Sequence, residues 1–349
     1  MDRAKNRSVY LDIVRVTALF CVILMHTGME VLTPGTGIGT ALLQAVIVVI
    51  RIGIPLFFMA SGALLLGREE TFSSLFKHRI LRFALVILLI QALQYWYMFR
   101  LEPWKIYLQY YLQTVYSGEF AAHTWYLYSY LAFLFMLPLL RRLVAGMERR
   151  HFHYLFIIYL VYMFIGSLGD VIWGGAFPLN AEFSVSFFLA REAVIYPLLG
   201  YYLHNKVVIR EREKTRAFAV ACWGAGAAAL ALSVVMRMLS RQVTGSWQFD
   251  PYHYISIPAA AFFFGTRIAC EKHVPGRRFS VLLATLSETS FATYLLHNIW
   301  LDLFQPLKGA AASAVGAFTA CLLQGLAALV LGTCISCVLK KIPGLKKLL

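Results

Sequence analysis

"LDIVRVTALFCVILMHTG", residues 11–28, decides the fold class of this chain, because it is apolar, long enough to cross a membrane, and still carries ionisable residues. A helix needs roughly 20 mainly apolar residues to cross the hydrocarbon core of a bilayer. Asp12, Arg15 and His26 interrupt the stretch, and ionisable groups at membrane depth normally face the protein interior or a water-filled cavity. The segment therefore predicts a helix enclosed by other membrane helices.

The composition of the whole chain supports this interpretation. Of its 349 residues, 60% are hydrophobic and 14% are charged, a balance that a single water-soluble core of this size does not accommodate. We therefore predict an all-α polytopic membrane protein with about ten transmembrane helices, some of them broken. The predicted spans are about 9–28, 40–66, 80–99, 123–140, 154–173, 183–203, 216–238, 252–269, 285–305 and 312–339.

The net charge of +15 is compatible with nucleic-acid binding or with a signal for membrane orientation. With a cytoplasmic N-terminus, 24 of the 32 Lys and Arg residues fall in cytoplasmic segments, five fall outside and three lie within spans. This asymmetry is the one that the positive-inside rule describes. We therefore expect both termini in the cytoplasm and no nucleic-acid partner.

The predicted spans are expected to form one transmembrane domain over residues 1–349, without a soluble domain. The first span lacks a small-residue cleavage motif, so we expect it to be retained as a helix. The longer connection at 100–122 is aromatic-rich and amphipathic, and we expect an extracytoplasmic interfacial segment or a lid. Cys334 and Cys337 have no nearby His or second cysteine pair, so no metal site is expected.

The ionisable residues of the first span share one side of the predicted helix. At about 100° per residue, Asp12, Arg15 and His26 fall on a single stripe. Arg15 and His26 lie about 16 Å apart along the axis, because each residue adds roughly 1.5 Å. The stripe thus connects the inner leaflet with the outer surface. Asp12 is the expected ion-pair partner of Arg15 at i, i+3, and simple charge neutralisation is the structural alternative.

Interruptions of the other spans would also mark a site, because irregular backbone at membrane depth must be satisfied by protein or by a cavity. Three segments are predicted to be broken. They are 51–67, which contains Gly53 and Pro55; 286–298, which is rich in Ser and Thr; and 191–200, which contains Pro197.

The pattern of Arg15, ten residues and then His26 resembles the signature of the acyltransferase-3 family of integral membrane acyltransferases, many of which O-acetylate bacterial surface glycans. Further segments resemble this family in the same order along the chain, and the combination is more specific than any single piece. They are PLFFMASGALL (55–65), FKHRILRF (76–83), HTWYLYSYLAFLFMLPLL (123–140), YPLLGYYL (196–203) and TYLLH (293–297).

The resemblance implies transfer of an acyl group, most often acetyl, from cytoplasmic acyl-CoA to an acceptor across a bacterial inner membrane. Acetyl-CoA is then a donor substrate, and no permanently bound cofactor is expected. Arg79 and Arg82, at i and i+3, are expected to hold the CoA phosphates. Arg51 and Ser61 are expected to complete the donor site, and with Arg191 they are candidates for stabilising a developing oxyanion.

His26 is the expected catalytic residue, because an imidazole can remove a hydroxyl proton near neutral pH or carry an acyl group itself. Arg15 and Asp12 are expected to support it. The acceptor is expected to be a hydroxyl of a surface polysaccharide or a lipid-linked saccharide. Candidate acceptor-site residues are His297, His123, Trp125, Tyr126, Arg191 and Glu288. A polysaccharide or small-molecule transporter remains the alternative, because charges and broken helices within a membrane also occur in carriers.

Overall fold

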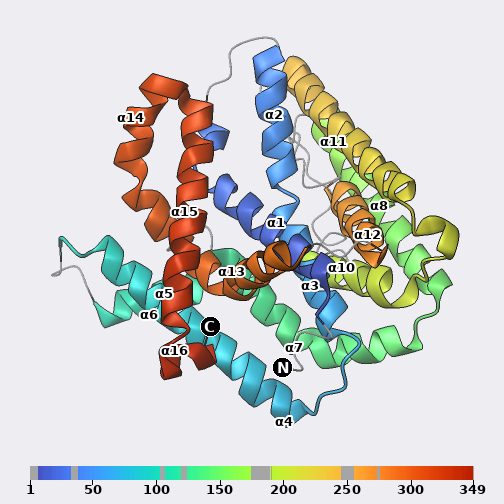
Figure 1. Cartoon of the computed structure of the whole chain (residues 1–349), viewed down its shortest axis with the longest axis horizontal. Coiled ribbons are helices and arrows are strands. Elements are labelled where there is room, and N and C mark those ends of the chain that lie inside the picture. Colours follow the sequence, from blue (N-terminus) through green and yellow to red (C-terminus); the bar gives the residue numbers. More distant parts are fainter. Residues whose placement is uncertain are drawn as a thin grey trace.

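The described residues of the computed structural model are mostly helical and contain no β-strand, which confirms the all-α class. They comprise residues 7–32, 38–102, 107–118, 124–173, 189, 191–244, 255–272 and 276–348. Figure 1 shows helix α1 near the centre of the molecule, with α2 above it, α3 below it, and α13 and α15 beside it.

The structure divides the chain into long apolar helices and short connecting ones. The α-helices are α1 (Val9–Met25), α2 (Ile38–Ile50), α3 (Gly53–Leu65), α4 (Phe72–Leu75), α5 (Leu81–Met98), α6 (Leu108–Ser117), α7 (Trp125–Gly146), α8 (Arg149–Trp173), α10 (Glu192–Tyr201), α11 (Arg216–Thr244), α12 (Ser256–Lys272), α13 (Arg277–Leu303), α14 (Gln305–Val315), α15 (Ala317–Leu339) and α16 (Pro343–Leu348). Tighter or wider turns form η2 (Met29–Val31), η3 (Phe76–Ile80), η7 (Tyr202–Lys206) and η8 (Glu211–Glu213).

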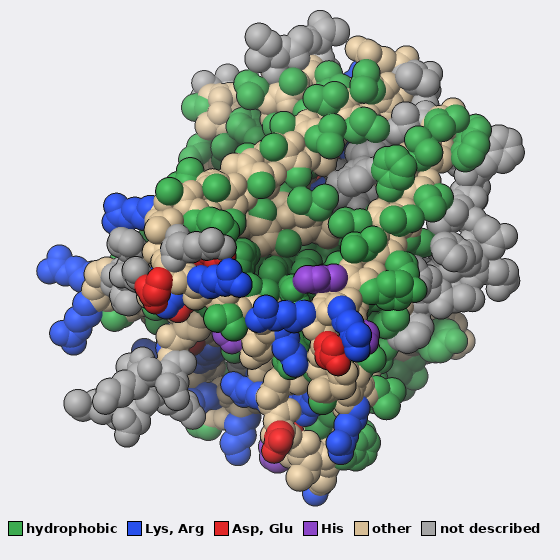
Figure 2. Space-filling model, turned by 90° about the vertical axis from the view of Figure 1, so that its right-hand side faces the viewer, with side chains coloured by type: hydrophobic (Ala, Val, Ile, Leu, Met, Phe, Trp, Pro, Cys, Tyr) green, Lys and Arg blue, Asp and Glu red, His purple; other side chains and the backbone are tan. Residues whose placement is uncertain are grey.

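Seven helical segments among the described residues are long and apolar enough to cross a membrane. Three other predicted spans correspond to shorter helices, since α1 and α12 have 17 residues each and α10 has 10. The count of ten spans and the cytoplasmic placement of both termini stay predictions. Figure 2 shows one face of the molecule, on which hydrophobic side chains cover the upper part and Lys and Arg side chains gather in the lower part.

Helix α1 is enclosed by its neighbours, as its polar stripe predicts. It packs against α3 on one side and α13 on another, with α2, α12 and α15 also in contact. Val14, Ala18, Leu19 and Ile23 of α1 are fully buried. Its ionisable side chains contact protein as well, since Asp12 meets Arg7, Arg15 meets Ser290 and His26 meets His297.

The predicted interruption of the second span is present. Helix α2 ends at Ile50 and α3 begins at Gly53, so a turn at Arg51 and Ile52 divides the segment. The segment 191–200 differs from the prediction in detail, because α10 begins directly after Arg191 and carries Pro197 in its interior.

The predicted interruption at 286–298 was wrong, because α13 runs unbroken from Arg277 to Leu303. The hydroxyl groups that suggested a break donate to carbonyl groups of their own helix. Thr289 donates to the carbonyl of Thr285 at 2.8 Å, and Ser290 donates to that of Ser287 at 2.8 Å. Local hydrogen bonds of this kind satisfy a polar side chain without a gap in the helix.

Helices α3 and α10 cross with their backbones in direct contact. A Cβ atom on Gly62 would lie 2.0 Å from the carbonyl oxygen of Pro197, and one on Gly200 would lie 2.0 Å from that of Met59. Small residues permit this approach in membrane proteins, where close packing replaces the hydrophobic effect between helices. The crossing fixes α3, which forms one wall of the site described below.

The connection at 100–122 contains the amphipathic helix α6, of which Leu108, Leu112 and Tyr116 are exposed and Thr114 is buried. Tyr111 on this helix donates to the carbonyl of Leu88 on α5 at 2.8 Å. Its extracytoplasmic position and its role as a lid stay predictions.

Candidate functional site

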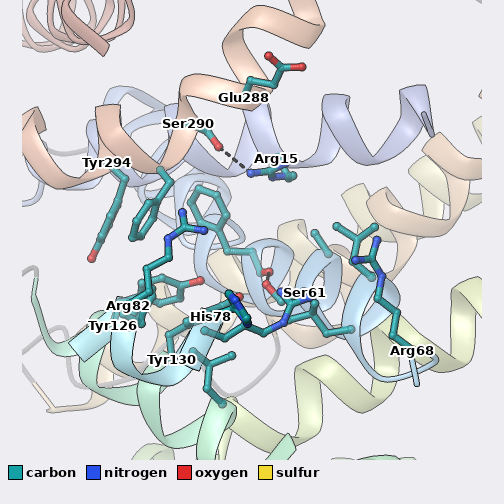
Figure 3. Close-up of a pocket in the computed structure, with 18 residues that line it drawn as sticks. Arg15, Ser61, Arg68, His78, Arg82, Tyr126, Tyr130, Glu288, Ser290 and Tyr294 are labelled. Carbon is teal, nitrogen blue, oxygen red and sulfur yellow. Dashed lines mark hydrogen bonds between the residues drawn. The ribbon is translucent and has the colours of Figure 1, made fainter. Parts of the chain in front are cut away.

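A cavity of about 360 Å³ lies between α1, α3, α5, α7 and α13. Figure 3 shows its polar lining, which brings together residues from distant parts of the chain. Four arginines and one glutamate line it, namely Arg15, Arg68, Arg79, Arg82 and Glu288. Its remaining lining is mostly apolar and aromatic. A cavity with a strongly basic lining favours an anionic ligand.

Arg79 and Arg82, which the sequence predicts to act together, both line this cavity. They lie on consecutive turns where η3 continues into α5. The Nε of Arg79 donates to both carboxylate oxygens of Glu70, at 3.2 and 3.0 Å. The Nε of Arg82 donates to the carbonyl of Leu348 in α16 at 3.1 Å. Both guanidinium groups are thus oriented by bonds through Nε.

Arg15 also lines the cavity, on the side formed by α1 and α13. Its Nη2 donates to Ser290 Oγ at 3.3 Å, the contact drawn as a dashed line in Figure 3. The expected ion pair with Asp12 was wrong, because Asp12 is bound by Arg7, at 2.6 Å from Nε and 3.0 Å from Nη2. Arg7 precedes the helix and reaches Asp12 with two donors at once, a geometry that favours an arginine–carboxylate pair.

Arg7 also donates to Glu288 and to the carbonyl of Ala284. Glu288 therefore lies at the end of the site where α1 begins, and its role toward an acceptor stays a prediction. Its side chain is 60% exposed. These contacts connect the start of α1 to α13. They thereby fix the position of Arg15 along α1 relative to Ser290 on α13.

Tyr126 and Tyr294 close the other end of the cavity, with their ring centroids 5.5 Å apart in an edge-to-face arrangement. Both side chains are buried. Tyr126 was predicted at the acceptor site, and it lines the same cavity as the basic pair. Its neighbour Trp125 is 38% exposed at the start of α7.

His26 and His297 form a pair of imidazoles beside Tyr294, whose ring centroid lies 5.5 Å from that of His297. Their ring centroids lie 5.1 Å apart at an angle of 45°. His297 is fully buried, and its Nδ1 donates to the backbone carbonyl of Tyr294. Neither histidine lines the described cavity. His26 is thus linked to the cavity wall through His297 and Tyr294.

The other predicted site residues divide into two groups. Ser61 lines the cavity, and its Oγ donates to the carbonyl of Phe57 at 2.9 Å. Arg51 lies outside the cavity lining and forms an ion pair with Glu30 at 3.0 Å. Arg191 is exposed at the start of α10 and does not line the cavity either. His123 lies outside the described residues.

Sequence reasoning missed Glu70, whose carboxylate is shared by several groups. Besides Arg79, it accepts from Arg141 Nη2 at 3.3 Å and from Ser74 Oγ at 3.2 Å. Burial acts to raise the pKa of Glu70, but the hydrogen bonds and charges of Arg79 and Arg141 outweigh it, so the pKa lies below its ordinary value. The available signal was its place in the sequence, two residues after Arg68 and nine before Arg79. No cluster of metal-ligating residues occurs among the described residues.

Long apolar helices around a basic cavity define a class of membrane proteins suited to an anionic ligand. The model of the acyltransferase domain of the acyltransferase-3 type matches residues 8–341, nearly the whole chain. The chain belongs to this family, and it is a membrane acyltransferase. Comparisons with curated proteins and with solved structures give no match.

Proposed function

We propose that the chain transfers an acetyl group from cytoplasmic acetyl-CoA to a hydroxyl of a polysaccharide or glycolipid outside a bacterial inner membrane. The observation that carries the proposal is a series of neighbouring groups. The basic cavity comes first and Tyr294 lines it; the ring of His297 lies 5.5 Å from that of Tyr294, and the ring of His26 lies 5.1 Å from that of His297. A donor with anionic phosphates and a thin acyl-bearing arm matches this order.

The donor end of the proposal rests on charge. The guanidinium groups of Arg79 and Arg82 line the cavity together with Arg68. Arginine recognises phosphate through paired N–H donors, so these residues suit the phosphates of CoA. The thioester then extends toward Arg15 and Ser61, which line the same cavity. Arg15 is a suitable donor to the thioester carbonyl oxygen as negative charge develops there.

The catalytic step is assigned to His26. Its imidazole takes the proton of the acceptor hydroxyl while that oxygen attacks the thioester carbonyl carbon. The carbon–sulfur bond then breaks, and the departing CoA thiolate takes the proton from the imidazolium. An ester and CoA–SH result. The variant in which the imidazole itself carries the acyl group uses the same residue as nucleophile.

His297 supports this assignment because a hydrogen bond fixes the position of its Nδ1 proton. Because its Nδ1–H donates to the carbonyl of Tyr294, a neutral His297 presents Nε2 as an acceptor. The two rings are close enough to orient each other. The proposal also requires that Tyr126 and Tyr294 move apart when donor binds, because His26 does not line the cavity and is connected to it through His297 and Tyr294. Such gating steps are common in enzymes.

The test uses purified protein in lipid nanodiscs with acetyl-CoA labelled in the acetyl group. Wild type is expected to release or transfer label, and His26→Ala is expected to abolish this while CoA binding stays unchanged. His151→Ala is the matched control, since His151 is an exposed imidazole on α8 that does not line the cavity. Full turnover by His26→Ala would refute the catalytic assignment. A wild type that transports a saccharide without consuming thioester would favour the transporter.

A further inference from the structure

We propose that Glu70 is a positioning residue for the donor site, which holds Arg79 with its guanidinium tip directed into the cavity. The inference rests on the proposed binding of CoA phosphates at Arg79. Glu70 lies in the connection between α3 and α4, and its side chain is 13% exposed. Glu70 itself is not proposed to contact the substrate.

The contacts of Glu70 join three elements around the cavity. Arg79 comes from η3, Arg141 comes from α7, and Ser74 comes from α4. All three donate to the Glu70 carboxylate. Arg141 also donates from Nε to the carbonyl of Leu65, the last residue of α3, at 3.0 Å. One carboxylate thus sets the relation between α3, η3 and α7 on the basic side of the cavity.

Charge makes the carboxylate necessary for this arrangement. The side chain of Arg141 is 12% exposed, and it meets Arg79 at the same carboxylate group. Two guanidinium groups held this close repel each other unless an anion lies between them. Removing the charge leaves a nearly buried cation without its counter-ion, which is unfavourable. Arg79 is then expected to turn away from the cavity.

Glu70 could either orient Arg79 or compete with phosphate for its guanidinium group. The atom of Arg79 that bonds to Glu70 distinguishes these two roles. In the described part of the chain, the hydrogen bonds from Arg79 to Glu70 involve Nε, and no other bond from its guanidinium tip occurs. The tip therefore stays available on the cavity side, where Arg79 is a lining residue. A carboxylate that competed with phosphate would occupy the tip instead. Glu70 is accordingly expected to assist donor binding.

The experiment measures the dissociation constant of CoA for the full chain in nanodiscs, with Glu70→Gln, Arg79→Ala and the double variant. Glu69→Gln is the matched control, because Glu69 is the exposed neighbour of Glu70. Glu70→Gln is expected to weaken CoA binding about tenfold, as loss of an orienting partner does at metal sites. In the Arg79→Ala background the same change is expected to have little further effect, since coupled residues are not additive.

The outcomes separate this inference from the proposed function. A wild type that does not bind CoA would overturn the donor assignment and the inference with it. If wild type binds and Arg79→Ala weakens binding, but Glu70→Gln leaves it unchanged or tightens it, only the positioning role is overturned. Full additivity in the double variant would overturn it as well, because Glu70 would then act without Arg79.

A second variant covers the case in which Glu70→Gln does not yield folded protein. Glu70→Asp keeps the charge on a side chain shorter by one methylene, so it cannot reach both arginines as before. CoA binding is expected to weaken less than in Arg79→Ala but measurably relative to Glu69→Gln. Binding equal to that of Glu69→Gln would contradict a role that depends on the geometry of the carboxylate.

Discussion

Replacing Gly62 by alanine tests the crossing of α3 and α10 that supports the cavity wall. The added Cβ atom would lie 2.0 Å from the carbonyl oxygen of Pro197, whereas ordinary contact begins at 3.4 Å. The two helices therefore have to separate by about 1.4 Å, because a backbone carbonyl cannot rotate away like a side chain. Overpacking of this kind costs about 1–3 kcal/mol. Alanine offsets only about 1 kcal/mol through its higher helix propensity.

Thermal unfolding of the purified protein measures the effect, and acetyl transfer is recorded in parallel. Gly62→Ala is expected to lower the melting temperature and also to reduce transfer, because Ala60 and Ser61 beside it line the cavity. Gly224→Ala in α11 is the matched control, since a Cβ atom there meets nothing within 4 Å. Equal melting temperatures for Gly62→Ala and Gly224→Ala would refute the reasoning from the backbone contact.

The remaining predictions concern the basic side of the cavity and its aromatic wall. Arg82→Ala is expected to raise the KM for acetyl-CoA more than it lowers kcat, whereas Arg142→Ala, an exposed control on α7, leaves both unchanged in steady-state assays. Tyr294→Ala is expected to cost about 3–5 kcal/mol of stability through the space it leaves, and Tyr294→Phe much less, as judged by thermal unfolding. The ion pairs of Glu70 are expected to contribute stability fully above pH 4.5, its ordinary pKa, and to lose it as the pH falls through its lower pKa in the folded protein. Melting temperatures of wild type and Glu70→Gln should therefore converge only in acid, and convergence at neutral pH would contradict the assignment.

Much of the fold could be predicted from apolar length and residue type. The ionisable stripe of α1 faces protein, and Gly53 and Pro55 mark the true interruption of the second span. The Ser- and Thr-rich stretch of α13 misled the prediction, because the sequence does not reveal whether a hydroxyl bonds to its own helix. Helix lengths could not be predicted from composition alone either, since α10 is shorter than the apolar stretch that contains it.

The site was predictable where spacing along one helix determines it. Arg79 and Arg82 line one cavity, as their i, i+3 spacing implies. Ion-pair partners from other helices or connections were not predictable, because the spacing along one helix does not show which charged residues other elements bring close. Asp12 pairs with Arg7 for this reason, and Arg51 with Glu30.

Because α13 is continuous, it connects the basic cavity mechanically with the pair of histidines. Ser290, which contacts Arg15, and His297, which contacts His26, stand on the same rigid rod about 10 Å apart. A rod of two turns cannot tilt at one point and stay still at the other. A ligand that displaced Ser290 would therefore also shift His297 and, with it, the ring that packs against His26.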